Sequence, residues 1–135
     1  MLGIKTKGNV ISLEAGEDFV KPFTCVGIGD ADGNVKYQDS STSVATAVIG
    51  VIQNSASDGE MVAVQLDGIS LIEVQAAVSR GSRVHVASID GRIDDSQDGT
   101  VGAVYLGIAL EAATAKGQII SVLINCPAVA EDGGS

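Results

Sequence analysis

Short aliphatic segments, divided by glycine-containing turns, constrain the fold of this chain more than any other feature of its sequence. Asp-Gly pairs at 32–33, 67–68 and 90–91 favour tight turns between strands. Because Val, Ile and Leu pack well on pleated sheets, the pattern predicts an all-β protein. Alanine clusters at 73–78 and 110–115 allow a short turn of helix, but both are too short for a mixed α/β fold. The expected strands are 10–13, 24–29, 34–38, 45–52, 60–66, 69–76, 83–88, 101–110 and 118–125, with an acidic loop at 92–99.

A shift of 58 residues lays segment 9–66 over segment 67–124 and keeps turn glycines in register. Gly33 then falls on Gly91, and Gly59 on Gly117. This repeat predicts two similar β-units packed into one barrel-like or β-tulip-like body, because neither unit buries its apolar face alone. We therefore expect a single β-rich domain over 9–126. The flanking segments, 1–8 and 127–135, are expected to be a flexible N-terminal arm and a flexible C-terminal tail.

The apolar content is aliphatic in kind, with 45% hydrophobic residues, no Trp and only 3% aromatic residues among the 135. So much aliphatic surface predicts that partner subunits cover part of it, the alternative being a dense monomeric core. No apolar run approaches the roughly 18 residues needed to span a bilayer, and residues 1–5 lack the apolar segment of a secretory signal. We expect no membrane partner and no export by that route.

The excess of acidic residues argues against a nucleic-acid partner. There are 17 Asp and Glu residues against 8 Lys and Arg residues, which gives a net charge of −9 at pH 7. Such a surface repels phosphate backbones, and the sequence has no Lys/Arg stripe interleaved with aromatic residues. We therefore expect the binding partners to be proteins.

The two cysteines, Cys25 and Cys126, are too few and too far apart for a metal-binding pattern. Because the chain start lacks an export signal, we expect both to be reduced and packed among apolar side chains. A single disulfide is the alternative, if the fold brings the two together.

His85 is the only histidine, so any nucleophile–histidine pair would have to include it. Strand alternation places it opposite Val84 and Val86, which predicts a solvent-facing or interface residue rather than a general base. No Gly-x-Ser-x-Gly motif occurs. A small β-barrel enzyme that uses the carboxylates of Asp94 and Asp98 is an alternative, but it lacks a convincing partner base. We expect no catalytic residues, no enzymatic activity and no cofactor.

Two acidic turns have the composition of loose cation sites. Asp30, Asp32 and Asn34 alternate like the start of a calcium loop, but Ser41 stands where a bidentate Glu is required and no helices flank the segment. We expect solvated carboxylates in both turns and no metal site. The second turn contains Asp90, Asp94, Asp95 and Asp98.

The segment after Gly59 has a characteristic order of glycines and strand aliphatics. GEMVAVQLDG at 59–68 is followed by GSRV at 81–84, DGRI at 90–93, LGIALEAA at 106–113 and GQIISVLI at 117–124. This order resembles the head decoration, or capsid cement, proteins of tailed bacteriophages. The likeness covers most of 24–125 and is strongest after Gly59. None of the matching residues is chemically distinctive.

The resemblance implies a compact β-rich protein, commonly a homotrimer, on the outer surface of the phage head. There it would bind the major capsid protein and stabilise the shell against the pressure of packaged DNA, after synthesis in the host cytoplasm. In such proteins an N-terminal arm often reaches onto the shell. The capsid-binding residues expected here are Leu2, Ile4, Lys5 and Lys7.

A carbohydrate-binding β-module displayed on a virion or cell surface is the alternative function. Sugar-binding sites usually need exposed aromatic rings, and this chain has only four aromatic residues, Phe19, Phe23, Tyr37 and Tyr105. The capsid role is therefore the preferred prediction.

Overall fold

The computed structural model describes residues 8–37, 48–99 and 105–125, and in these residues the protein is all-β with no helix. The fold class predicted from the sequence is therefore confirmed. In the described part, no helix is long and apolar enough to cross a membrane. The strands are β1 (Val10–Ala15), β2 (Cys25–Ile28), β3 (Asn34–Tyr37), β4 (Val48–Ile52), β5 (Met61–Gln65), β6 (Asp67–Glu73), β7 (Arg83–Val86), β8 (Ile93–Asp94), β9 (Gly107–Ala109) and β10 (Ile119–Asn125).

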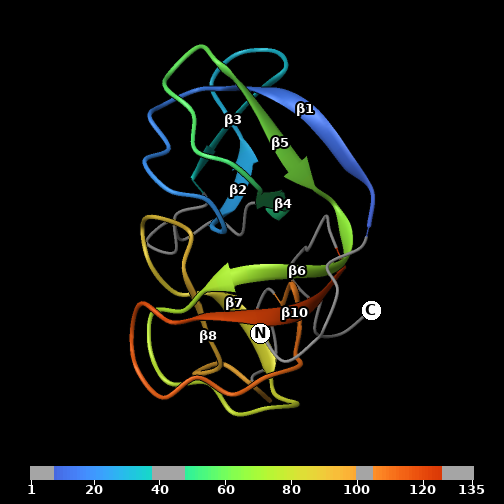
Figure 1. Cartoon of the computed structure of the whole chain (residues 1–135), viewed down its shortest axis with the longest axis vertical. Coiled ribbons are helices and arrows are strands. Elements are labelled where there is room, and N and C mark those ends of the chain that lie inside the picture. The colour runs from blue at the N-terminus through green and yellow to red at the C-terminus, as the bar shows by residue number, and fades with distance from the viewer. Residues whose placement is uncertain (1–7, 38–47, 100–104, 126–135) are drawn as a thin grey trace.

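The first unit, β1 to β5, is a closed barrel with strand order β1-β3-β2-β4-β5. β1 pairs with β5 in antiparallel fashion along most of its length. It pairs with β3, in parallel, only at Glu14 and Ala15. The barrel is therefore closed by a very short contact, and the first half of β1 extends beyond it (Figure 1).

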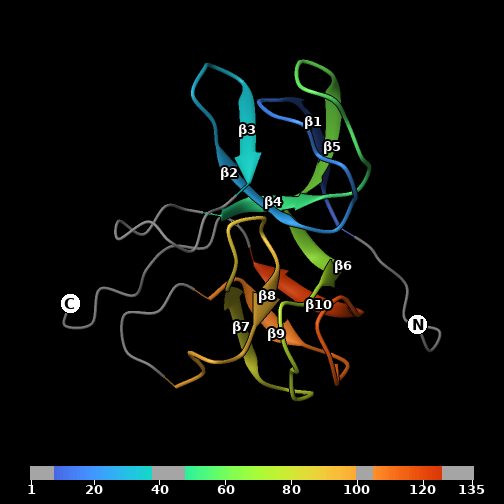
Figure 2. The same ribbon diagram turned by 90° about the vertical axis from the view of Figure 1, so that its left-hand side faces the viewer.

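The second unit, β6 to β10, is a curled sheet with strand order β6-β10-β9-β7-β8. β2 and β7 begin 58 residues apart, as do β5 and β10. Corresponding strands have the same neighbours, except that β1 pairs with β3 whereas β6 and β8 are the two ends of the second sheet. The two similar β-units predicted from the sequence are thus confirmed, and Figure 2 shows them stacked along the long axis. An origin by duplication of 9–66 into 67–124 stays a prediction, as do the boundaries of arm and tail.

The two units share part of their apolar core. One buried cluster fills the barrel and includes Phe19 and Ile52. A second cluster belongs mainly to the curled sheet and includes Ile72, together with Cys25 and Val51 of the first unit. Cys25 is buried in this shared core, as expected. Cys126 lies outside the described residues, so its state stays a prediction.

Two local predictions were wrong, and one alternative that the sequence allowed is not realised. Asp67 and Gly68 lie in β6 rather than in a turn, although Gly68 has a φ of 79°. The Asn9 amide donates to the Asp67 carboxylate, and the Gln65 side chain donates to the Asp67 carbonyl. Segments 73–78 and 110–115 form no helix, because Val78 and Ala113 join them in an antiparallel bridge. The acidic segment 92–99 contains the short strand β8, which pairs with β7.

A buried carboxylate joins the two units at their junction. Glu73 is only 5% exposed, and its Oε2 lies 2.8 Å from Lys21 Nζ and 3.6 Å from Arg92 Nη1. The Glu73 amide also donates to the Phe23 carbonyl at 2.8 Å. A buried charge is tolerated only when it is paired in this way, so these contacts fix how the units meet.

Substitution of two equivalent glycines should separate backbone strain from close packing. Gly33 and Gly91 both have φ of 79°, where a Cβ costs about 1–2 kcal/mol. At Gly33 a Cβ would meet nothing within 4 Å, whereas at Gly91 it would lie 2.4 Å from the Cys25 carbonyl oxygen. We expect Gly91→Ala to destabilise by about 2 kcal/mol more than Gly33→Ala, measured by urea unfolding. Equal losses would show that the units do not approach as closely as described.

Candidate functional site

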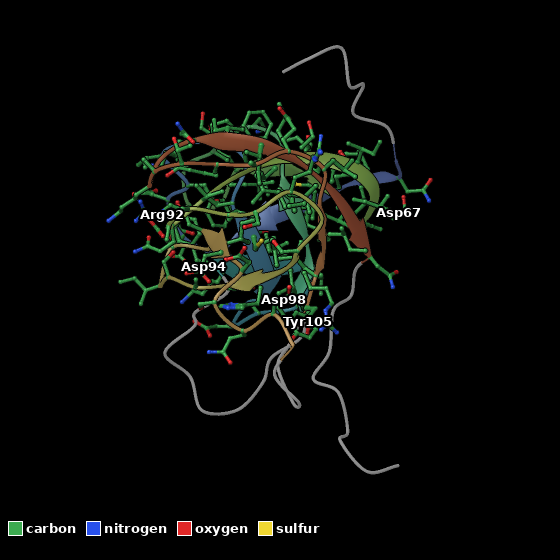
Figure 3. All side chains as sticks on the ribbon, turned by 90° about the horizontal axis from the view of Figure 1, so that it is seen from below. Asp67, Arg92, Asp94, Asp98 and Tyr105 are labelled. Atoms are coloured by element: carbon green, nitrogen blue, oxygen red, sulfur yellow. The ribbon has the colours of Figure 1, made fainter. Side chains whose placement is uncertain are left out.

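Four residues predicted to bind the capsid, Leu2, Ile4, Lys5 and Lys7, lie outside the described part of the chain, so their role stays a prediction. The structure does fix the point where this segment joins the body. A Cβ on Gly8 would lie 1.9 Å from the Asp67 carbonyl oxygen, so Gly8 packs tightly against the start of β6. The Asn9 amide and side-chain NH₂ donate to the Asp67 carboxylate at 2.9 and 3.0 Å. The N-terminal segment is therefore attached where the two units meet, near the labelled Asp67 in Figure 3.

The carboxylates of the two acidic turns mostly contact neighbouring donors of the chain itself. Asp30 forms an ion pair with Lys36 at 2.6 Å. Asp95 accepts hydrogen bonds from the Ser79 amide and the Ser82 hydroxyl, both at 2.9 Å. In the described segments, no group of three or more His, Cys, Asp or Glu residues is placed to hold a metal ion. These turns are therefore organised by hydrogen bonds within the protein.

The prediction that His85 faces solvent or an interface was wrong, because its side chain is buried with 8% exposure. The segment after β8 folds back over β7 and covers the ring. His85 Nδ1 lies 2.9 Å from the Val86 carbonyl oxygen, to which it donates, and Nε2 accepts the Gln97 amide at 3.2 Å. These partners suit a neutral imidazole, and burial lowers the His85 pKa despite the opposing effect of Asp94.

Sequence analysis missed that a serine and a carboxylate accompany His85. Ser96 Oγ and Asp94 Oδ1 each lie 3.1 Å from His85 Nε2. In a catalytic triad the carboxylate orients the opposite ring nitrogen, leaving the other free to accept the serine proton. Here the Ser96 hydroxyl donates to Asp94 at 2.8 Å, so it does not point its proton at the imidazole. The cluster holds the loop in place and lacks the geometry of an activated nucleophile. The carboxylates of Asp94 and Asp98 do not form a catalytic pair either, because Asp98 forms an ion pair with Arg83 at 2.8 Å.

An aliphatic row lies on the outer face of the curled sheet. Leu123 of β10 pairs with Ile108 of β9 on one side and with Ile69 of β6 on the other. Ile108 and Leu123 are 43% and 46% exposed, whereas Val122, the residue before Leu123, faces the core and is fully buried. The exposed Ile108 and Leu123, with the half-buried Ile69 beside them on β6, form a candidate surface for contact with another protein.

Comparison with known proteins identifies the family. The family model described as phage cement protein matches residues 5–124. This chain belongs to the phage cement protein family. The predicted role in decorating the phage head capsid is therefore supported, and the carbohydrate-binding alternative is not favoured. Membership also places the protein on the virion capsid.

A solved structure shares this fold. It is the N base of head fiber gp8.5 of bacteriophage phi29, which is similar with a TM-score of 0.64 at 14% identity, over 87% of this chain and 93% of that chain. At this identity the likeness concerns the fold. A search of curated proteins gave no match.

The stability of this cement protein should fall in mild acid because of His85. Its pKa is lowered from 6.5 in the folded state, so below pH 6.5 the unfolded chain takes up the proton first. The stabilising effect is complete above 6.5 and is lost as the pH falls toward the folded-state pKa. We expect the melting temperature of the wild type to decrease more between pH 7 and pH 5 than that of His85→Asn. Parallel curves for the two proteins would contradict this assignment.

Proposed function

We propose that this protein covers the outer surface of the phage head as a homotrimer, contacts the major capsid protein and has no enzymatic activity. The family match over 5–124 is the observation that carries the proposal. We further propose that the protein is made in the host cytoplasm and then docks on the assembled head.

The chemistry of the described residues supports a binding role. The single imidazole is buried and contacts Val86 and Gln97 through both nitrogens. Among the carboxylates, Glu73 bridges the two units and Asp98 pairs with Arg83. Groups engaged in this way stabilise the fold and are poorly placed to act on a substrate.

The N-terminal segment is proposed as a capsid contact. Two aliphatic residues, Leu2 and Ile4, are followed by Lys5 and Lys7, and Gly8 and Asn9 attach the segment to Asp67. Three such segments on one trimer would bind by avidity, so each contact can be weak. The proposed capsid-binding residues are Leu2, Ile4, Lys5 and Lys7.

The aliphatic row is proposed as the contact between subunits. Each chain has a net charge of −9, so copies repel one another unless they meet through an uncharged surface. Ile69, Ile108 and Leu123 provide such a surface on neighbouring strands.

Deletion of residues 1–7 should weaken binding to phage heads by at least about tenfold, since each lost contact is multiplied by the number of arms. Gly8 and Asn9 are kept in the deletion, so we expect an unchanged melting temperature and unchanged subunit association. Binding is measured by co-sedimentation with purified heads that lack their own cement protein. Wild-type occupancy by the shortened protein would contradict the role of the arm.

Leu123→Glu should convert the trimer to monomers, because a charge would be buried in an apolar contact. Ile89→Glu is the matched control, since Ile89 is 69% exposed and lies outside the aliphatic row. Sedimentation velocity at equal protein concentrations gives the readout. A trimer that survives Leu123→Glu would show that another face joins the subunits.

A further inference from the structure

The first half of β1, residues 10–12, has one strand edge without a partner in the described part of the chain. Successive residues of a strand direct their N–H and C=O groups to opposite sides. The Ala15 amide donates to the Glu60 carbonyl on the β5 side, at 2.8 Å. The Glu14 amide donates to the Gly33 carbonyl on the β3 side, at 3.1 Å.

Val10 and Ser12 alternate with Glu14, so their backbone groups face the β3 side. β3, however, pairs with β1 only at Glu14 and Ala15. Within segments 8–37, 48–99 and 105–125, no strand or loop hydrogen-bonds to this side of Val10 or Ser12. Figure 1 shows this part of β1 at the right flank of the barrel, with no other coloured ribbon beyond it.

This edge is short, but in the described residues no charge, proline, bulge or covering segment protects it against strand pairing. Natural edge strands are covered, or they contain charged residues, prolines or bulges that prevent another chain from adding. Residues 10–13 contain none of these, and β1 pairs regularly with β5 through this stretch. Val10 and Ile11 are 51% and 41% exposed, although their side chains point to opposite faces of the strand. An uncovered aliphatic edge of this kind is suited to receive a further strand.

The second unit shows what the same edge looks like when it is closed. β6 corresponds to β1, and the carbonyl groups of Asp67 and Ile69 on its outer edge both accept hydrogen bonds from Gln65 Nε2 at 2.8 Å. The Glu73 amide on that edge donates to Phe23. The edge of β6 is thus closed by groups of the chain itself, whereas the edge of β1 stays open in the described part of the protein.

The charges around the open edge restrict the segment that fits it. Glu14 lies at one end of the edge, next to the turn that contains Asp32. Asp67 lies at the other end, bound to Asn9. An added strand with basic groups would meet these carboxylates favourably, whereas the body of a second copy, at net −9, would be repelled.

We infer that an extended segment of the capsid shell, aliphatic and basic in alternation, adds to β1 as a further strand along Val10 and Ser12. This inference rests on the proposed function, because it names how the capsid is engaged. The open edge directly follows the N-terminal segment proposed as a capsid contact.

Amide hydrogen exchange with residue-level resolution tests this pairing directly. In the free protein the Ile11 and Leu13 amides, which face β5, should exchange slowly, and those of Val10 and Ser12 should exchange fast. On phage heads the Val10 and Ser12 amides should slow by at least about tenfold, since each gains a hydrogen bond. Unchanged exchange at both positions in the head-bound protein would overturn the inference.

Two variants test the edge by affinity. Ser12→Pro removes an N–H that takes no part in the pairing with β5, so it blocks strand addition while the barrel is retained. Val10→Lys places a charge on the edge, and Val20→Lys is its matched control, because Val20 is 80% exposed and lies away from the edge. We expect Ser12→Pro and Val10→Lys to bind heads at least about tenfold more weakly than the wild type, and Val20→Lys to bind like the wild type.

The outcomes separate this inference from the proposed function. If the wild type itself does not bind heads, the proposed function fails and the inference fails with it. If the wild type binds and Val10→Lys and Ser12→Pro bind equally well, only the inference fails. Should Ser12→Pro alter the oligomeric state of the free protein, the edge is a contact between copies and the capsid segment is the wrong occupant. Val10→Lys keeps the test decisive if Ser12→Pro does not fold.

Discussion

The shared apolar core between the two β-units is the interaction on which the rest of the structure depends. Neighbouring residues of one strand contribute to different clusters: Val51 faces the core of the curled sheet and Ile52 the interior of the barrel. Cys25 and Val26 are divided in the same way. Strands β2 and β4 are thus buried on both faces, which explains why their sequences are almost continuously apolar. A single unit on its own would expose one of these faces to water.

This double burial shows how far sequence alone can predict the fold. Asp-Gly at 32–33 and at 90–91 forms turns as predicted, although Gly33, Gly68 and Gly91 all have φ of 79°. The same dipeptide at 67–68 lies in a strand, because Asn9, which is 58 residues away in sequence, binds Asp67. The local sequence is the same in each case, so only the long-range contact distinguishes them. His85 was misplaced for a related reason, since strand alternation says nothing about a later loop that covers the strand.

The candidate site was predictable only in kind. The aliphatic composition and the absence of catalytic patterns indicated a protein that works by contact, and the family match supports this. The particular surfaces depend on strand register. Ile108 and Leu123 lie in different sequence segments, but the pairing of β9 with β10 makes them direct neighbours. The open edge depends on an even finer detail, which is that β3 stops pairing at Glu14. No sequence pattern within one strand reports where its neighbour ends.

Two units with the same strand order have been adapted to different tasks. Gly33 occupies an open turn, whereas its counterpart Gly91 touches the Cys25 backbone and joins the units. The edge of β6 is closed by Gln65, whereas the corresponding edge of β1 at Val10 and Ser12 has no partner among residues 8–37, 48–99 and 105–125. In each pair the copy in the second unit contributes to the internal junction and the copy in the first unit remains at the surface. The carboxylates at the junction and around His85 are engaged within the protein, whereas the edge of β1 and the aliphatic row are exposed in its described part. Such contacts are individually weak and chemically plain, so a protein that uses them gains strength by repeating them over a lattice.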